Sequence, residues 1–310
     1  MTDLSIIVPV YNEASSIPTL YQRIKNVLIN LACSYEIIFV NDGSRDTSLT
    51  LIKDLATSNP EVKFIDFSRN FGHQIAVSAG LEFSSGARIV IIDADLQDPP
   101  EMIASMYEKM SEGWNVVYAR RVQRKGENFL KLLTAKVFYR LLKGLTSTHI
   151  PVDTGDFRMI DRKVANAVLQ MPERHKFLRG MISWVGFKQT YLEYVRDSRY
   201  AGRSGYSFRK MIRFAMDGIT GFSNLPLKMA TVFGFIFSAI AFLLILYTLY
   251  ARFFSNDYVQ GWASIMMISI LFIGGVQLIC VGLIGEYLIR MDANLKQRPL
   301  FIINETNIRK

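Results

Sequence analysis

IVIIDADLQD, residues 89–98, is the most informative stretch of the chain, because an apolar run leads directly into a cluster of oxygen-bearing side chains. On an extended backbone, residues two positions apart point to the same side, so Asp93 and Asp95 face one way and Gln97 continues on that side. Such oxygens suit Mg²⁺ or Mn²⁺, and an ion of this kind also binds a diphosphate. The stretch predicts a buried strand that ends in a metal site, and a strand followed by an ordinary polar turn remains the alternative.

Around this stretch, apolar runs typical of strands alternate with segments typical of helices. Strands are predicted over residues 4–10, 36–40, 62–67 and 88–92, and helices over residues 15–31, 47–57 and 74–83. The strands are almost continuous Ile and Val, which is typical of strands buried on both faces of a mostly parallel sheet. The pattern therefore predicts an α/β domain whose ligands bind beyond the carboxyl ends of the strands.

Polar residues gather where these strands end. The first strand is followed by Tyr11 and Glu13, the second by Asp42, and the fourth by Asp93 and Asp95. The segment 41–44, Asn-Asp-Gly-Ser, taken alone also suits a simple turn. Three carboxylate-bearing strand ends on one rim nevertheless favour a binding site.

Two windows near the C-terminus, residues 229–250 and 263–283, contain no charged residue. Each would span about 30 Å as a helix, which matches the hydrocarbon core of a bilayer. We expect a transmembrane hairpin over residues 228–290, with spans at about 229–250 and 263–287. Basic residues flank the hairpin, whereas the connector holds only Arg252, so the positive-inside rule places both termini in the cytoplasm.

The net charge and the cysteine count limit the kinds of binding partner and of fold that the chain can have. The 310 residues carry a formal charge of +9, which suits nucleic acid, anionic lipid or a phosphorylated substrate. Next to a membrane anchor the last two are favoured, and no nucleic-acid partner is expected. Cys33 and Cys280 are the only cysteines, and the second lies inside a predicted span, so a disulfide framework is excluded.

The ordered set of motifs resembles inverting glycosyltransferase family 2. The matching segments are SIIVPVYNE (5–13), VNDGSRD (40–46), SRNFG (68–72), DADLQDPP (93–100) and GDFR (155–158). With the two C-terminal spans, the chain is similar to the polyprenyl-phosphate glycosyltransferases, and most similar to the bacterial bactoprenol glucosyltransferases of O-antigen glucosylation clusters. The resemblance covers essentially the whole chain.

This resemblance implies a GT-A nucleotide-sugar-binding fold and a role for each matched residue. The implied nucleotide-sugar-binding residues are Pro9, Tyr11, Glu13, Asp42, Arg69 and Asp93. Asp93, Asp95 and Gln97 would hold the Mg²⁺ or Mn²⁺ ion, and the sequence does not choose between the two metals. The implied catalytic residues are Asp156, Asp95 and Arg158, with Asp156 acting as a base, as a sugar-positioning group or as an orienter of Arg158. Among the histidines, His73 is the one expected near the donor.

A lipid phosphate acceptor requires cations near the membrane. The candidates are Arg120 and Arg121 after a strand, and Arg199 and Arg203 in a later loop. Residues 126–145 show the pattern of a basic amphipathic helix at the membrane interface, with an ordinary surface helix as the alternative. Residues 206–227 are predicted to form a second interfacial helix.

The predicted organisation is a cytoplasmic catalytic domain over residues 1–205, the interfacial helix, the hairpin, and a cytoplasmic tail over residues 291–310. The resemblance implies transfer of glucose from UDP-glucose to undecaprenyl phosphate at the bacterial inner membrane, with a separate flippase and a downstream glycosyltransferase as partners. Another donor sugar, such as mannose or an aminosugar, and an inactive membrane scaffold are the alternatives. The pair Gly274-Gly275 permits close helix packing, so a homo-oligomer is also considered.

Overall fold

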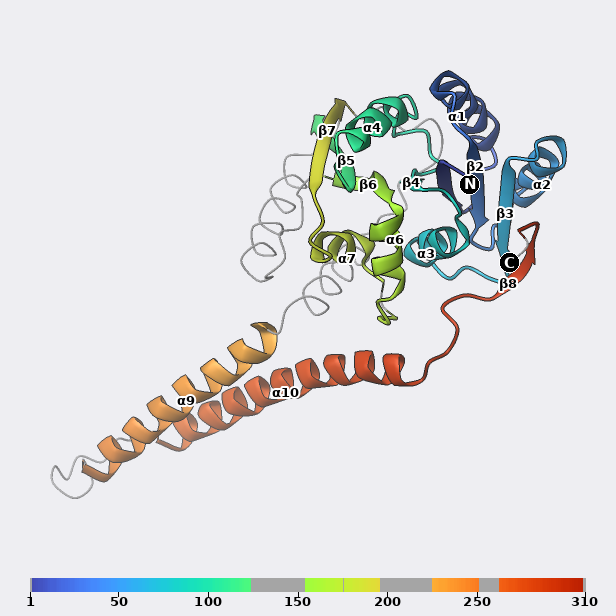
Figure 1. Ribbon diagram of the computed structural model, residues 1–310. Coiled ribbons are helices and arrows are strands. Elements are labelled where there is room, and N and C mark those ends of the chain that lie inside the picture. Colours follow the sequence, from blue (N-terminus) through green and yellow to red (C-terminus); the bar gives the residue numbers. More distant parts are fainter. Residues whose placement is uncertain (1, 124–153, 175, 196–224, 251–261, 309–310) are drawn as a thin grey trace. The chain divides into compact units, whose positions relative to one another are not determined.

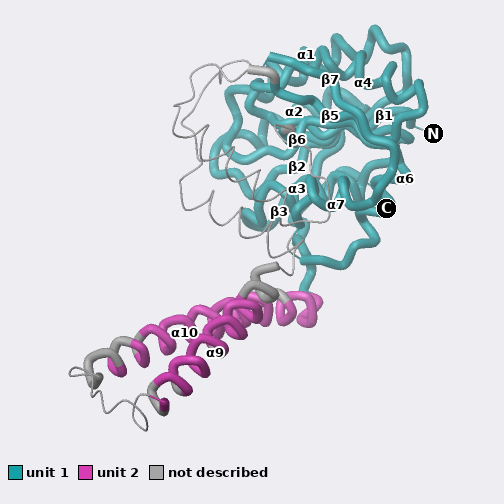
Figure 2. The backbone as a smooth tube through the Cα atoms, turned by 90° about the vertical axis from the view of Figure 1, so that its left-hand side faces the viewer, with its two compact units in different colours: residues 1–218, 298–310 teal, residues 219–297 magenta. Residues whose placement is uncertain are grey.

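The computed structural model describes residues 2–123, 154–174, 176–195, 225–250 and 262–308. The chain divides into two compact units, one formed by residues 1–218 with 298–310 and the other by residues 219–297 (Figure 2). The predicted helix over 126–145, most of the predicted helix over 206–227, Arg199 and Arg203 lie outside the described residues.

The first unit is built on one sheet (Figure 1). Its described strands are β1 (Leu4–Val10), β2 (Tyr35–Asn41), β3 (Val62–Phe67), β4 (Arg88–Ile91), β5 (Val116–Gln123), β6 (Thr154–Asp161), β7 (Gln189–Val195) and β8 (Ile303–Thr306). They lie in the order β7-β5-β6-β4-β1-β2-β3-β8. β1 is parallel to β2 and β4, and β2 is parallel to β3, whereas β6 lies antiparallel between β4 and β5. The predicted α/β fold with a mostly parallel sheet is confirmed.

Helices cover both faces of the sheet (Figure 1). They are α1 (Ile17–Leu31), α2 (Ser48–Ser58), α3 (His73–Phe83), α4 (Met102–Ser111), α6 (Arg162–Leu169) and α7 (Leu178–Trp184). On one face, Ile6 and Val8 of β1 pack with α1, α2 and α4 in the main apolar core. On the other face α3 lies so close to β1 that a Cβ on Gly80 would come within 2.3 Å of Ile7 Cγ2. Burial on both faces explains why the strands carry apolar residues at nearly every position.

β8, at the C-terminus, completes the edge of the sheet by pairing antiparallel with β3. The ring of Phe301 stacks on Phe67 with centroids 5.1 Å apart, and Ile302 O accepts a hydrogen bond from the Ser68 N–H at 3.0 Å. Asn304 Nδ2 also donates to Asp66 Oδ2 at 2.8 Å. The sequence interpretation treated residues 291–310 as a tail, and this strand was not predicted because it is short and little of it is apolar.

Removing this strand is expected to destabilise the catalytic unit. A chain that lacks residues 300–310 loses the β3 pairing and the Phe301 stack, which together contribute about 2 kcal/mol. We therefore expect a fall in the midpoint of thermal unfolding of about 5 °C or more, measured by near-UV circular dichroism. A chain that lacks only residues 309–310 is the control, and equal midpoints for the two truncated chains would contradict a stabilising role.

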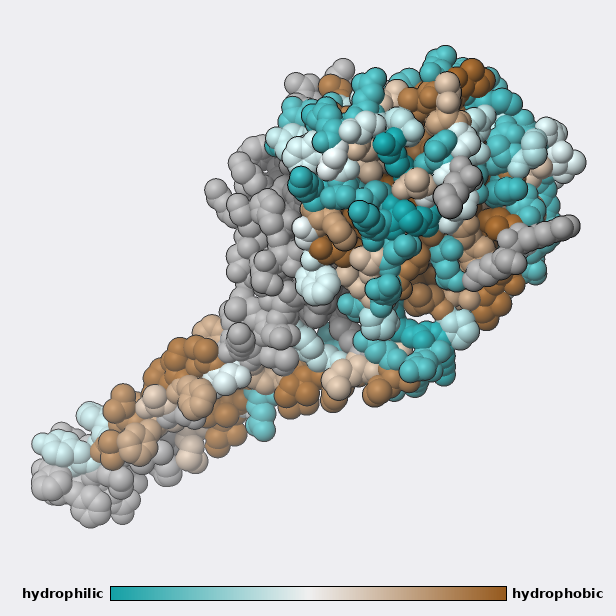
Figure 3. Space-filling model, viewed as in Figure 1, coloured by the Kyte–Doolittle hydropathy of each residue, from teal (hydrophilic) through white to brown (hydrophobic). Residues whose placement is uncertain are grey.

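The described residues of the second unit form the helices α9 (Leu225–Tyr250) and α10 (Trp262–Leu295), which contact each other through Phe237 and Phe272. Large apolar side chains are exposed at many of the described positions of both helices, and they give the visible face of this unit much of its hydrophobic surface (Figure 3). Within the described residues, Phe272–Leu295 of α10 is long and apolar enough to cross a membrane, whereas Ala230–Leu244 of α9 is a shorter apolar stretch. The predicted hairpin of two membrane-spanning helices is therefore not confirmed, since one helix alone meets the length requirement among these residues.

Candidate active site

The carboxyl ends of β1, β2 and β4 meet at one edge of the sheet, as their parallel pairing requires. Val10 at the end of β1 lies opposite Asn41 at the end of β2. The loops that follow these three strands carry the predicted site residues Tyr11, Glu13, Asp42, Asp93, Asp95 and Gln97, and Pro9 lies within β1 itself. The parallel sheet thus brings the three strand ends to one rim, as the sequence predicted.

Hydrogen bonds fasten the loop after β1 to the loop after β2. Asn12 has a left-handed backbone with φ of 56°, which asparagine tolerates. Its N–H donates to Ser44 Oγ at 3.0 Å, and its Oδ1 accepts from the Arg45 N–H at 2.7 Å. Tyr11, next to this junction, is 44% exposed and offers an aromatic face at the rim. A rigid rim with an exposed ring suits the stacking of a nucleotide base.

Asp42 is buried and holds the loop that precedes α3. Its carboxylate accepts hydrogen bonds from the Phe71 N–H at 2.6 Å and the Gly72 N–H at 3.0 Å. Burial raises the pKa of Asp42 above its ordinary value, although these N–H groups act in the opposite direction. Gly43 has φ of 66°, and a Cβ there would lie 2.5 Å from the Arg69 carbonyl carbon. Asp42 and Gly43 therefore hold the loop after β2 tightly against the loop of residues 69–72.

Arg69, which was predicted to bind the nucleotide sugar, lies exposed in the same loop. Its guanidinium covers the ring of Phe71, with 4.1 Å between the guanidinium carbon and the ring centroid. Arg69 Nη1 also donates to Asn70 O at 3.1 Å. The stacked ring restricts the guanidinium and leaves an exposed positive charge at this loop.

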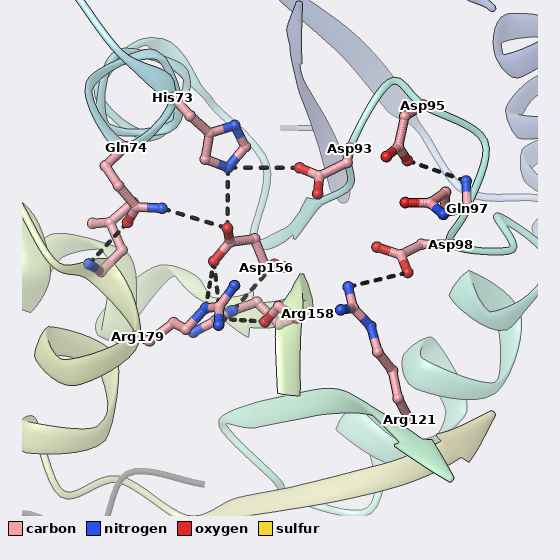
Figure 4. Close-up of polar contacts among 12 residues, drawn as sticks. His73, Gln74, Asp93, Asp95, Gln97, Asp98, Arg121, Asp156, Arg158 and Arg179 are labelled. Carbon is pink, nitrogen blue, oxygen red and sulfur yellow. Dashed lines mark hydrogen bonds and ion pairs between the residues drawn. The ribbon is translucent and has the colours of Figure 1, made fainter. Parts of the chain in front are cut away.

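Asp156 on β6 is the centre of the polar network in Figure 4. Its Oδ2 lies 3.1 Å from His73 Nε2 and 3.4 Å from Gln74 Nε2, while its Oδ1 accepts from Arg179 Nε at 2.9 Å. Arg158 Nη2 lies 3.5 Å from the same Oδ1. His73 begins α3 and Arg179 lies on α7, so three separate elements converge on one carboxylate. Because β6 runs antiparallel beside β4, it carries Asp156 to the edge where Asp93 lies.

The charges in this cluster shift one another's protonation. Burial raises the pKa of Asp93 to about 6. Burial alone would lower the pKa of His73, but the charges of Asp93 and Asp156 outweigh it and raise this pKa to about 9. Burial also opposes ionisation of Asp156, yet Arg179 and His73 hold the pKa of Asp156 well below its usual range. These mutual interactions favour the protonated form of His73 and the ionised form of Asp156.

A group of possible metal ligands lies within this network. One ligand atom each of His73, Asp93 and Asp156 falls within 4.8 Å of the others. Asp93 Oδ1 is buried, accepts no hydrogen bond within the described part of the protein, and lies 3.6 Å from His73 Nε2. Carboxylate and imidazole ligands suit Mn²⁺, and carboxylates suit Mg²⁺. These residues therefore fit a divalent cation.

The predicted metal ligands Asp95 and Gln97 lie on the other side of Asp93 (Figure 4). Asp95 is nearly buried, and its Oδ1 accepts a hydrogen bond from the Gln97 N–H at 3.1 Å. Asp93 is thus common to two possible ligand sets, one with Asp95 and Gln97 and one with His73 and Asp156.

Two of the predicted cationic residues are engaged inside the protein. Arg158, 1% exposed, donates from Nη2 to Gly155 O at 2.7 Å and from Nε to Asp156 O at 3.2 Å. Arg121 lies 3.6 Å from the fully buried Asp98. Arg120, by contrast, is 43% exposed and covers the ring of Tyr191 at the edge of the sheet.

Sequence reasoning missed Gln74, Arg179 and Tyr194, and found His73 only as a neighbour of the donor site. Gln74 Oε1 accepts from the Leu178 N–H at 3.1 Å, which joins the start of α3 to α7. Arg179 has no motif around it and is distant from Asp156 in the sequence, so no local signal marks it.

The sequence is similar to known glycosyltransferases, in agreement with the predicted family. Residues 5–169 match the family model described as "Glycosyl transferase family 2". The chain is 50% identical over 302 residues to the "Uncharacterized glycosyltransferase YkcC" of Bacillus subtilis, with 97% of this chain and 93% of that protein covered. It is 39% identical over 304 residues to the "Bactoprenol glucosyl transferase" of Shigella phage SfII, with 98% of each chain covered.

Similarity to solved structures is weaker. The glucosyl-3-phosphoglycerate synthase of Mycobacterium tuberculosis, solved in complex with Mn²⁺, UDP-glucose and phosphoglyceric acid, has a TM-score of 0.47 and 17% identity, covering 71% of this chain and 78% of that one. A similarity this low transfers neither substrate nor metal. The family match spans more than half of the chain, and the GT-A-like α/β fold agrees with it. The chain therefore belongs to glycosyltransferase family 2, as its motifs predicted.

Proposed function

We propose that this glycosyltransferase moves glucose from UDP-glucose to undecaprenyl phosphate, with inversion at the anomeric carbon. The observation that carries the proposal is the cluster at the sheet edge, where Asp93 and Asp156 lie beside His73 close enough to share one cation. Similarity over nearly the full length to a bactoprenol glucosyl transferase supports the choice of sugar and acceptor.

The donor is proposed to bind along the rim formed by the loops after β1 and β2. Tyr11 supplies a ring on which the nucleotide base stacks. Pro9 near the end of β1 and Glu13 in the loop after it lie close to Tyr11 in the sequence. Asp42 shapes the pocket through its hydrogen bonds to the Phe71 and Gly72 N–H groups. Arg69 places its charge toward the diphosphate.

A Mg²⁺ or Mn²⁺ ion is proposed at Asp93. Asp95 and Gln97 complete the ligand set that the motif implies, while His73 and Asp156 form the other set that the geometry permits. When bound, such an ion neutralises negative charge on the UDP leaving group.

The surroundings of Asp156 favour a positioning role over a role as base. Four donors approach its two oxygens, and a carboxylate held in its ionised form by Arg179 and His73 is a weak proton acceptor. A phosphate monoester, with a second pKa of about 6, is already largely ionised near neutral pH. Its oxygen attacks the anomeric carbon, the bond from that carbon to the UDP oxygen breaks, and UDP leaves with the electron pair. No proton has to be removed in this step.

The acceptor phosphate is proposed to meet cations that include Arg120, together with Arg199 and Arg203, which lie outside the described residues. The second unit is proposed to anchor the enzyme as a two-helix hairpin in the bacterial inner membrane, with the catalytic unit and both termini in the cytoplasm. Its exposed apolar side chains, such as Phe235 and Leu278, each 74% exposed, support a lipid environment. The product would remain in the cytoplasmic leaflet, so a separate flippase and a downstream glycosyltransferase are required.

The decisive test is transfer from a panel of radiolabelled UDP-sugars and GDP-mannose to undecaprenyl phosphate, in detergent with Mg²⁺ or Mn²⁺. We expect glucose to be transferred by the wild type and activity to fall about 100-fold or more in Asp95→Ala. Asp54→Ala, which changes an exposed aspartate of α2, is the matched control and should retain activity. Transfer of another sugar would contradict the proposed donor but not the proposed reaction type. No transfer from any donor would favour a membrane scaffold.

A further inference from the structure

The loop from Asp93 to Asp98 is fastened at both ends. At its start Asp93 lies just after β4, which ends at Ile91, and at its end Asp98 is 0% exposed. Between them Leu96 has a left-handed backbone with φ of 60°, a conformation that is costly for a residue with a side chain and that persists only when its surroundings enforce it. The position of Asp98 is therefore one of the constraints that set the conformation of this loop.

Two side chains from the neighbouring strands β5 and β7 hold Asp98. The Tyr194 hydroxyl of β7 donates to Asp98 Oδ1. Arg121 Nη2 of β5 lies 3.6 Å from the same oxygen (Figure 4). Arg121 Nε also donates to the Tyr194 hydroxyl oxygen at 3.0 Å. Asp98, Arg121 and Tyr194 thus form a closed triangle, named here the Asp98 clamp. A buried carboxylate that loses such partners is strongly destabilised, so the clamp resists movement of the loop.

The same two side chains also touch the strand that carries Asp156. The ring of Tyr194 meets the ring of Phe157 edge-on, with centroids 6.4 Å apart. A Cβ on Gly155 would lie 2.4 Å from Arg121 Nη2, so Arg121 passes directly over the residue before Asp156. The clamp therefore contacts the loop of Asp93 on one side and both chain neighbours of Asp156 on the other.

We propose that Asp98, Arg121 and Tyr194 are positioning residues that set the distance between the Asp93–Asp98 loop and Asp156, and thereby the affinity of the site for a divalent cation. The inference rests on the proposed metal-dependent function. It also gives Arg121 a role different from the acceptor-phosphate contact that its sequence position predicts. Arg121 has a side chain only 15% exposed, whereas that of the neighbouring Arg120 is 43% exposed and better placed to meet a phosphate from outside.

The test is Mn²⁺ binding in the presence of UDP, measured by isothermal titration calorimetry on the full-length protein in detergent. Tyr194→Phe removes one hydroxyl and keeps the ring against Phe157, and it is expected to weaken Mn²⁺ binding at least tenfold, as is usual when a residue that orients metal ligands is lost. Tyr191→Phe, the same change at a half-exposed position of β7, is the control and should leave Mn²⁺ binding unchanged. Unchanged Mn²⁺ binding in Tyr194→Phe would overturn the inference.

Arg121 variants separate the two roles of this residue. Arg121→Gln is expected to weaken Mn²⁺ binding tenfold or more while leaving the KM for undecaprenyl phosphate within about twofold of the wild type. Arg121→Lys keeps the charge beside Asp98 but loses the Nε donor, so its Mn²⁺ affinity should lie between those of the wild type and Arg121→Gln. This variant replaces Arg121→Gln in the test if Arg121→Gln does not fold. A raised KM for the lipid with unchanged Mn²⁺ binding would assign Arg121 to the acceptor and refute the positioning role.

The same titration keeps this inference apart from the proposed function. Mn²⁺ and UDP binding by the wild type without sugar transfer to undecaprenyl phosphate would overturn the proposed acceptor, while the comparison of variants would still decide the role of the Asp98 clamp. A wild type that binds no Mn²⁺ with UDP would overturn both.

Discussion

Replacing Asp156 by asparagine is expected to lower kcat for sugar transfer about 100-fold to 1,000-fold, with a much smaller change in the KM for UDP-glucose. Asparagine has nearly the same shape, but it lacks the negative charge that holds Arg179 and the protonated His73. Without that charge, three cationic groups, including Arg158, would repel one another at the centre of the site. Steady-state kinetics with radiolabelled UDP-glucose and undecaprenyl phosphate measures both constants.

Further measurements distinguish positioning from proton transfer. If Asp156 positions Arg179, then Arg179→Gln should also reduce kcat strongly, and the double variant should be little worse than either single one. Protonation of Asp156 should cause no loss of the wild-type rate between pH 8 and pH 5, because the pKa of Asp156 is held well below its usual range. Rescue of Asp156→Asn by a small added base would instead identify Asp156 as the base. Asp54→Asn is the charge-matched control.

Replacing Asp93 by asparagine is expected to abolish metal-dependent transfer. Activity should fall by a factor of about 100 or more at every Mg²⁺ or Mn²⁺ concentration. Asp93 is common to both possible ligand sets, and its buried oxygen accepts no hydrogen bond within the described residues. Chelation with EDTA should likewise stop the wild-type enzyme, and added Mn²⁺ or Mg²⁺ should restore it. The measurement is initial rate against metal concentration for both proteins.

A second pair of variants decides which ligand set is used. Asp95→Asn should weaken Mn²⁺ binding if Asp95 and Gln97 complete the site, whereas His73→Ala should weaken it if His73 and Asp156 do so. Wild-type activity that survives complete removal of divalent cations would contradict a metal at Asp93 in either arrangement.

Much of the fold could be read from local patterns along the chain. Runs of Ile and Val in β1, β2 and β4, separated by amphipathic helices, predicted the parallel sheet because burial on both faces demands apolar residues at every position. The same logic placed the loops of Tyr11, Asp42 and Asp93 on one rim, since parallel strands share their carboxyl edge. The strand β8 was not predicted because it is short and little of it is apolar, so its pairing with the distant β3 leaves no local pattern.

The family, the α/β class, the meeting of three strand ends at one edge of the sheet and the Asp93-x-Asp95 pattern could all be predicted, because each depends on residue types at short, regular spacing. The side chains that meet at that edge could not be predicted in this way. His73 and Asp156 are 83 positions apart, and Tyr194 and Asp98 are 96 positions apart. They meet because β6 enters the sheet antiparallel beside β4 and β7 pairs with β5, an order that follows from the packing of the whole sheet and leaves no local pattern in the chain.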